Sequence, residues 1–267
     1  MTRLPTFENP PVVEQVLAVR FAPLDAFTSP YLGSFWSRVE SDFPIAFERG
    51  PYDMPLERLG DALPRGGIEF TVGPPPAKTR AWLVSADDER LIQIQRDFFA
   101  YNWRKRKGDY DRYEVGRDNF AKYFREFEAF LADKGLGEIG PRQCEVTYIN
   151  HIRPGPPSKL SSLVSVLQEP ELRQPATALL TANLALVLAL EKDGARFANL
   201  HVSAVPATQG DDDESIWVLT LTARGLPLGE GIGGILAFLD LSRRAIVTNF
   251  VTLTTEECHK EWGLTWP

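Results

Sequence analysis

The feature that most constrains the fold is the order in which strand and helix patterns follow one another along the 267 residues. Alternating apolar residues predict strands, and apolar residues at helical spacing predict helices. Each half of the chain, residues 1–140 and residues 141–267, is predicted to contain one strand, a helix, three strands and a second helix. This order predicts an α+β protein made of two similar units that form one compact body, with antiparallel strands and with the helices on one face of the sheet.

In the first half, the helix ends are the best marked features. Ser29 followed by proline begins a helix that stops before Pro44. A second helix begins near Tyr113 and ends at Gly135, because glycine readily adopts the left-handed conformation that terminates helices. Strands are predicted over residues 13–21, 67–72, 79–85 and 90–104, and a long loop over residues 44–66.

In the second half, Asp193-Gly194 predicts a tight hairpin turn. Thr254 with Glu257 three residues later predicts the capped start of a last short helix. Strands are predicted over residues 143–152, 178–190, 196–205 and 216–224, and helices over residues 160–167 and 232–250. The halves share no clear residue-level identity, so the predicted duplication depends on element order. That order resembles the TATA-binding-protein architecture, and the resemblance implies a topology and no function.

Composition excludes several classes of protein. The formal net charge of −7 argues against a protein held on nucleic acid by bulk charge. The two cysteines are too few for a metal cluster or a disulfide framework, which suits a reducing compartment. No apolar run has the length of a signal peptide or a membrane span. We therefore expect a soluble cytoplasmic protein without a metal or other cofactor and without a membrane partner.

The usual catalytic motifs are missing from the sequence, including phosphate-binding loops, nucleophile elbows and paired metal-binding histidines. No catalytic residue is therefore predicted in the main interpretation. One enzyme alternative remains open, in which Asp97 acts with His151 or Tyr148 as an acid–base pair.

Residues 91–104 are predicted to form one long strand that has polar residues where apolar ones are expected. Amides and charges are mixed with aromatic residues on both faces, a composition more typical of a binding surface than of a packed core. The alternative is a set of structural ion pairs, since a buried charge needs a partner. The candidate binding residues are Gln93, Gln95, Arg96, Asp97, Tyr101, Asn102, Trp103 and Arg104, with Tyr148 and Asn150 from the strand over residues 143–152.

A dense basic run, Arg104 to Lys107, follows Tyr101 and Trp103 directly. Aromatic rings beside cations can stack on bases and neutralise phosphates. This pattern favours a second hypothesis, binding of single-stranded nucleic acid. An exposed strand end is the simpler interpretation of the same run.

Four motifs together resemble a sporadically distributed prokaryotic family of about this length, over nearly the whole chain. They are Asn9-Pro10-Pro11-Val12-Val13-Glu14, Phe35-Trp36, Gln93-x-Gln95-x-Asp97-x-Phe99-x-x-Asn102-Trp103-Arg104 and Tyr148-x-Asn150. The family has no established activity, so the resemblance implies no catalytic residue. Its patchy distribution implies a defence or toxin–antitoxin setting. The leading hypothesis is a non-enzymatic binding or accessory protein that holds a protein partner or a small ligand.

Overall fold

A computed structural model describes residues 4–53, 56–57, 59, 79–153, 160–165, 182–210 and 213–266. The main sheet contains β2 (Val12–Phe21), β3 (Ile45–Arg49), β4 (Arg80–Val84), β5 (Arg90–Gln95), β6 (Phe98–Arg104), β7 (Pro141–Ile152), β8 (Leu184–Lys192), β9 (Ala195–Gln209) and β10 (Glu214–Gly225). The helices are α1 (Ser29–Val39), α2 (Tyr113–Lys134), α3 (Leu160–Leu163), α4 (Gly231–Leu253) and α5 (Glu256–Glu261). Two short strands near the chain ends, β1 (Thr6–Phe7) and β11 (Leu264–Thr265), pair with each other.

All nine strands of the main sheet are antiparallel to their neighbours, in the order β3-β4-β5-β6-β2-β7-β10-β9-β8. The central pair joins the two predicted halves, with Leu17 of β2 opposite Val146 of β7. Outward from this pair the order is β6, β5, β4 on one side and β10, β9, β8 on the other. The α+β prediction is confirmed, and both halves share one sheet. Duplication of the sequence and a boundary after residue 140 stay predictions.

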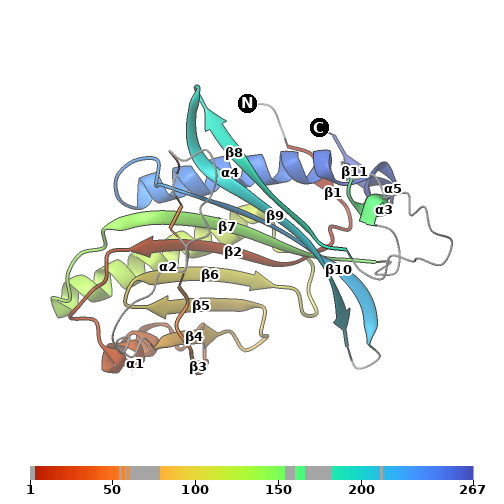
Figure 1. Cartoon of the computed structure of the whole chain (residues 1–267). Helices are drawn as coiled ribbons and strands as arrows, with labels where there is room; N and C mark the ends of the chain where they lie inside the picture. The colour runs from red at the N-terminus through yellow and green to blue at the C-terminus, as the bar shows by residue number, and fades with distance from the viewer. Residues whose placement is uncertain are drawn as a thin grey trace.

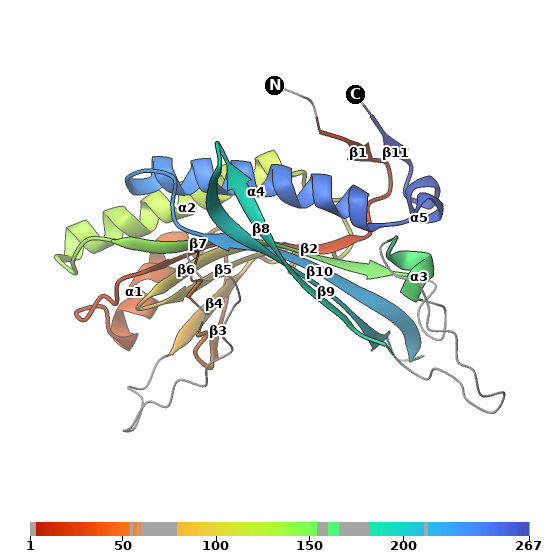
Figure 2. The same cartoon turned by 45° about the horizontal axis from the view of Figure 1, so that its top comes forward.

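The two long helices, α2 and α4, lie side by side on one face of the sheet (Figures 1 and 2). The buried apolar face of α2 contributes Phe120, Phe124 and Phe127, whose ring centroids lie 5.7, 5.4 and 5.8 Å from that of Phe99 on β6. Burial of such rings is the main favourable term for a layer of this kind. We call this side of the sheet the helix face. The opposite side, which α2 and α4 leave uncovered, is called the open face.

The prediction of one strand over residues 90–104 is wrong, because the segment is a hairpin. β5 ends at Gln95 and β6 begins at Phe98, with Arg96 and Asp97 forming the turn. The chain reverses, so residues of β5 and β6 share a face according to cross-strand pairing and not according to one continuous period of two. Gln93, for example, lies opposite Ala100.

Several ends differ from their predicted positions. The predicted loop over residues 44–66 contains the edge strand β3, and α1 ends at Val39, before the predicted stop. Residues 67–72 and 178–181 lie outside the described residues. Thr255 caps α5 in place of Thr254, whose hydroxyl instead donates to Phe250 O at 2.7 Å at the end of α4. The predicted turn at Asp193-Gly194 is confirmed, with φ angles of 52° and 77° that suit a type I′ hairpin.

No helix in the described part of the chain combines the length and the apolar character that a membrane crossing requires.

Candidate functional site

The hairpin distributes the predicted binding residues between the two faces of the sheet. Gln93, Asn102 and Arg104 lie on the open face, where their side chains contact one another or the β4–β5 turn. Tyr101 and Trp103 lie on the helix face, each only 1% exposed. Tyr101 stacks on Tyr123 of α2 at 6.1 Å, so it belongs to the core.

Tyr148 and Asn150 of β7 also lie within the protein. Gln15 of β2 donates to the Tyr148 hydroxyl at 2.7 Å and to that of Tyr110 at 2.6 Å. Burial raises the pKa of Tyr148, which keeps the hydroxyl neutral and able to donate. Asn150 donates to Leu219 O at 2.9 Å. The structure therefore gives Tyr148 and Asn150 roles in packing and hydrogen bonding on the helix face.

A row of hydrogen bonds crosses four strands of the open face. Asn102 of β6 donates to Glu14 Oε1 of β2 at 2.6 Å, and Gln93 of β5 donates to Asn102 Oδ1 at 2.9 Å. Gln93 Oε1 in turn accepts from Trp82 Nε1 at 3.1 Å and from Arg80 Nη1 at 2.9 Å, both on β4. The side-chain amides of Asn102 and Gln93 each direct the NH₂ group toward β2 and the oxygen toward β4. The row fixes the orientation of Trp82 and Arg80.

Three arginines surround Trp82 at the end of this row. The guanidinium carbons of Arg49, Arg80 and Arg104 lie 4.9, 5.6 and 5.8 Å from the ring centroid. Arg80 also lies over the Tyr52 ring at 5.6 Å. Such cation–π contacts hold guanidinium groups in place while leaving N–H donors available. We call Arg49, Arg80, Trp82, Gln93 and Arg104 the Trp82 cluster.

The Trp82 cluster is positively charged within an acidic chain. Among the described residues, no carboxylate forms an ion pair with Arg49 or Arg80. Burial lowers the pKa of Arg80, and the neighbouring charge of Arg49 lowers it further. Arg80 still remains protonated at neutral pH, because the pKa of arginine starts from a very high value. Arg80 Nε and Arg104 Nε have no hydrogen-bond partner in the described part of the chain, but both atoms are buried and do not face solvent. What the arrangement offers an anion is the positive charge of Arg49 and Arg80.

Glu14 is the carboxylate at the opposite end of the row. Burial raises its pKa, and the hydrogen bond from Asn102 and the charge of Arg104 only partly offset that effect. Because the pKa of this acid is raised on folding, the ionised form of Glu14 costs stability above that pKa, and the cost disappears as the pH falls through it. Glu14 interacts with Arg104 of the Trp82 cluster, whereas no ion pair of Glu14 with Arg49 or Arg80 is found among the described residues.

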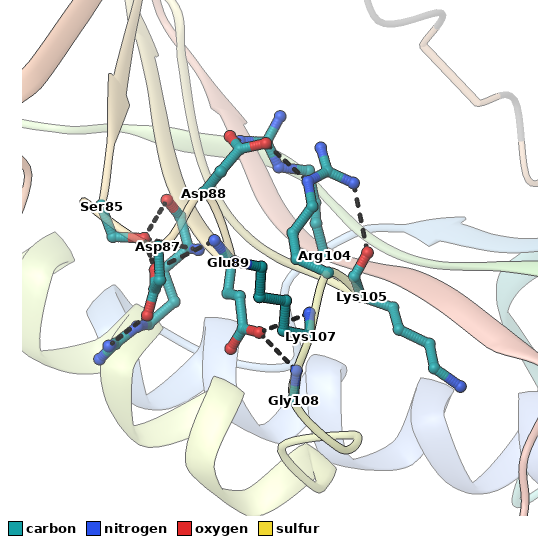
Figure 3. A network of polar contacts seen from close by, with 10 residues as sticks. Ser85, Asp87, Asp88, Glu89, Arg104, Lys105, Lys107 and Gly108 are labelled. Carbon is teal, nitrogen blue, oxygen red and sulfur yellow. Dashed lines mark hydrogen bonds and ion pairs between the residues drawn. The ribbon is translucent and has the colours of Figure 1, made fainter. Parts of the chain in front are cut away.

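The turn between β4 and β5 pairs with the two arginines of the basic run that follows β6 (Figure 3). Asp88 pairs with Arg104 and, at 2.6 Å, with Arg106. Glu89 accepts from the backbone N–H groups of Lys107 and Gly108 at 3.2 and 2.8 Å. Tyr101 and Trp103 are buried and offer no exposed rings for stacking, whereas no ion pair of the Lys105 or Lys107 side chain is found in the described part of the chain. Nucleic-acid binding by this run therefore stays a prediction that lacks its aromatic half.

The centre of the open face is crossed by residues before β4. The Tyr52 N–H donates to Gln95 Oε1 at 3.0 Å, and Gln95 Nε2 donates to the Tyr52 carbonyl oxygen at 2.9 Å. Glu57 accepts from Asn199 Nδ2 at 2.6 Å and contacts His201 Nε2 at 2.6 Å, both on β9. Burial alone would raise the pKa of Glu57, but the bonds from His201 and Asn199 outweigh it and the pKa is lowered. Gln95 is thus a structural anchor.

The turn residues Arg96 and Asp97 form local ion pairs. Arg96 pairs with Asp25, and Asp97 lies 3.9 Å from Arg20. Gln95 Nε2 donates to Asp97 Oδ1 at 2.6 Å. The structural alternative therefore accounts for Arg96 and Asp97.

The acid–base pair of the enzyme alternative does not form. Asp97 lies at one end of β2, where its carbonyl accepts from Phe21 N–H, and His151 lies at the other end, bonded to Pro11 O. Gln143, opposite Arg20, and His151 are eight residue steps apart on β7, which span about 26 Å. Tyr148 is on the helix face.

The described residues contain no group of three histidine, cysteine, aspartate or glutamate side chains placed to hold a metal ion. Comparisons with protein-family models, curated proteins and solved structures find no match to this chain.

Sequence reasoning missed Arg49, Arg80 and Trp82. The available signal was that Arg80 and Trp82 alternate with the apolar residues Ala81 and Leu83. This alternation places the side chains of Arg80 and Trp82 on the face opposite the core. No local pattern indicates that Arg49 joins them, because that contact depends on the pairing of β3 with β4.

Proposed function

We propose that this chain is a non-enzymatic binding protein whose open face holds an anionic group, a carboxylate or phosphate, carried by a small ligand or a partner protein. The observation that carries the proposal is the Trp82 cluster, in which Arg49 and Arg80 have no carboxylate partner in the described part of the chain. Guanidinium groups bind carboxylates and phosphates through paired N–H donors. A cytoplasmic location in a prokaryote, in a defence or toxin–antitoxin setting, belongs to the same proposal.

The hydrogen-bonded row supports this proposal through preorganisation. Gln93 holds the side chains of both Arg80 and Trp82, so little conformational freedom remains to be lost when a ligand binds. An ordinary surface arginine loses far more freedom on binding. The site is therefore built before the ligand arrives.

Native mass spectrometry of the protein purified from its own host tests the proposal. We expect wild-type protein to carry a bound molecule or partner that Arg80→Met protein has lost, because Met keeps the apolar stem and removes the charge. Arg142→Met is the matched control, since Arg142 is exposed at the start of β7 and its loss changes net charge equally. Retention of the same species by Arg80→Met, or wild-type protein without any bound species, would contradict the proposal.

A further inference from the structure

The outer edge of β8 is unusually apolar for the last strand of a sheet. β8 pairs with β9 on one side, and no described strand pairs with its other side. Residues 184–190 are all apolar, and the first charge is Glu191. Edge strands are normally protected by charged residues, proline or bulges, because their free N–H and C=O groups can pair with another chain. This edge has no such protection over seven residues.

The side chains along this edge are also accessible. Ala185, Val187 and Ala189 on the open face are exposed, Val187 to 43%. Leu186 and Leu188 on the helix face are partly exposed. An added strand would therefore cover apolar surface on both faces and satisfy the free backbone groups.

The sequence of the edge identifies the strand that fits it. Residues 184–190 read Leu-Ala-Leu-Val-Leu-Ala-Leu, which is the same in both directions about Val187. In an antiparallel pair related by a two-fold axis, a palindromic strand places identical residues opposite each other at every position. Leucines would face leucines, alanines would face alanines, and Val187 would face its own copy.

The charges beyond the palindrome are compatible with the same register. With Val187 on the axis, Glu191 faces Asn183 and Lys192 faces Ala182 of the second copy, so no like charges meet. The opposite edge of the sheet differs. β3 reads Ile-Ala-Phe-Glu-Arg, and self-pairing about its centre would set Glu48 against Ala46 and Arg49 against Ile45. Of the two edge strands, β8 and β3, only β8 is therefore self-complementary.

We infer that β8 pairs with β8 of a second copy of this chain, joining two nine-stranded sheets into one continuous sheet. The inference does not depend on the Trp82 cluster, which lies toward the other end of the sheet, on β3 to β6 (Figure 1). A dimer of this kind presents two Trp82 clusters at its far ends.

Light scattering during size-exclusion chromatography, over the micromolar concentration range, tests the inference. We expect wild-type protein to approach twice its 29.9 kDa mass and Val187→Lys protein to remain at that mass, because two lysines would face each other on the axis. Val205→Lys is the matched control, since Val205 is an exposed valine of β9, 37% accessible, outside the paired edge. A monomeric wild type, or a dimer that Val187→Lys leaves intact, would overturn the inference.

A cross-linking variant tests the register without relying on disruption. Val187→Cys is expected to form an intermolecular disulfide under mild oxidation, because opposed residues of antiparallel strands lie about 4.5–5.5 Å apart at Cα. The natural cysteines, Cys144 and Cys258, are buried and give a low background. Val205→Cys should stay monomeric on a non-reducing gel. Equal cross-linking of Val187→Cys and Val205→Cys would contradict the proposed axis.

Discussion

Phe127→Ala is expected to lower the free energy of unfolding by about 3–5 kcal/mol, the usual cost of removing a fully buried phenylalanine ring. Phe127 is completely buried on α2. Its ring centroid lies 6.3, 5.4, 5.3 and 5.8 Å from those of Phe21, Phe27, Phe35 and Phe99. One ring thus links α1, α2, β2 and β6. Denaturant unfolding followed by circular dichroism measures the loss.

Phe47→Ala is the control for this prediction. Phe47 lies on the edge strand β3 and is 46% exposed, so its removal leaves no cavity. We expect a change of less than about 1 kcal/mol, as for most surface substitutions. Similar losses for Phe127→Ala and Phe47→Ala would show that the helix layer is not the main core.

Glu145→Met is expected to destabilise the protein by about 3–5 kcal/mol, because removing one partner of a buried ion pair leaves the other charge uncompensated. Arg224 Nε on β10 donates to Glu145 Oε2 on β7 at 2.5 Å, and the two side chains are 16% and 6% exposed. Burial opposes the charge of Arg224, but Glu145 more than offsets it and raises the pKa of Arg224. Glu57, 3.9 Å from Arg224, provides a weaker second partner.

The double variant Glu145→Met with Arg224→Met separates an isolated charge from lost packing. We expect it to recover most of the stability that Glu145→Met loses, because no buried charge then remains and the methionines fill similar space. Urea unfolding of the two single variants and the double variant gives the coupling energy. Additive losses would mean that Glu145 and Arg224 stabilise the sheet independently.

Much of the fold was predictable because its elements have strong local signals. The start of α2 at Tyr113, its end at Gly135 in the left-handed conformation, and the Asp193-Gly194 turn all lie where the sequence indicates. The turn at Arg96-Asp97 was missed because it contains no glycine, proline or asparagine, and apolar residues follow it immediately. Only pairing across the sheet, beyond the reach of a local pattern, shows that the chain reverses there.

The candidate site was predicted in part for the same reason. Gln93, Asn102 and Arg104 lie on the open face, whereas Tyr101 stacks on Tyr123 of α2 and Trp103 packs against Tyr110 on the helix face. A binding role for these residues stays a prediction. Because the chain reverses after β5, the aromatic residue that contacts the Gln93 amide is Trp82 on the neighbouring strand β4. Long-range strand pairing assembles the Trp82 cluster from segments that are separate in sequence.

The most direct test of the central claim is an NMR titration of the Trp82 indole N–H, observed in protein labelled with ¹⁵N at its six tryptophans and assigned with Trp82→Phe. Pyrophosphate and citrate serve as probes, with chloride as the ionic-strength control. Anion binding at the Trp82 cluster predicts a saturable shift of the Trp82 signal that chloride does not produce and that Arg80→Met abolishes. A Trp82 signal that moves no more than those of the buried Trp103 and Trp217, or that moves equally in Arg80→Met, would contradict the claim.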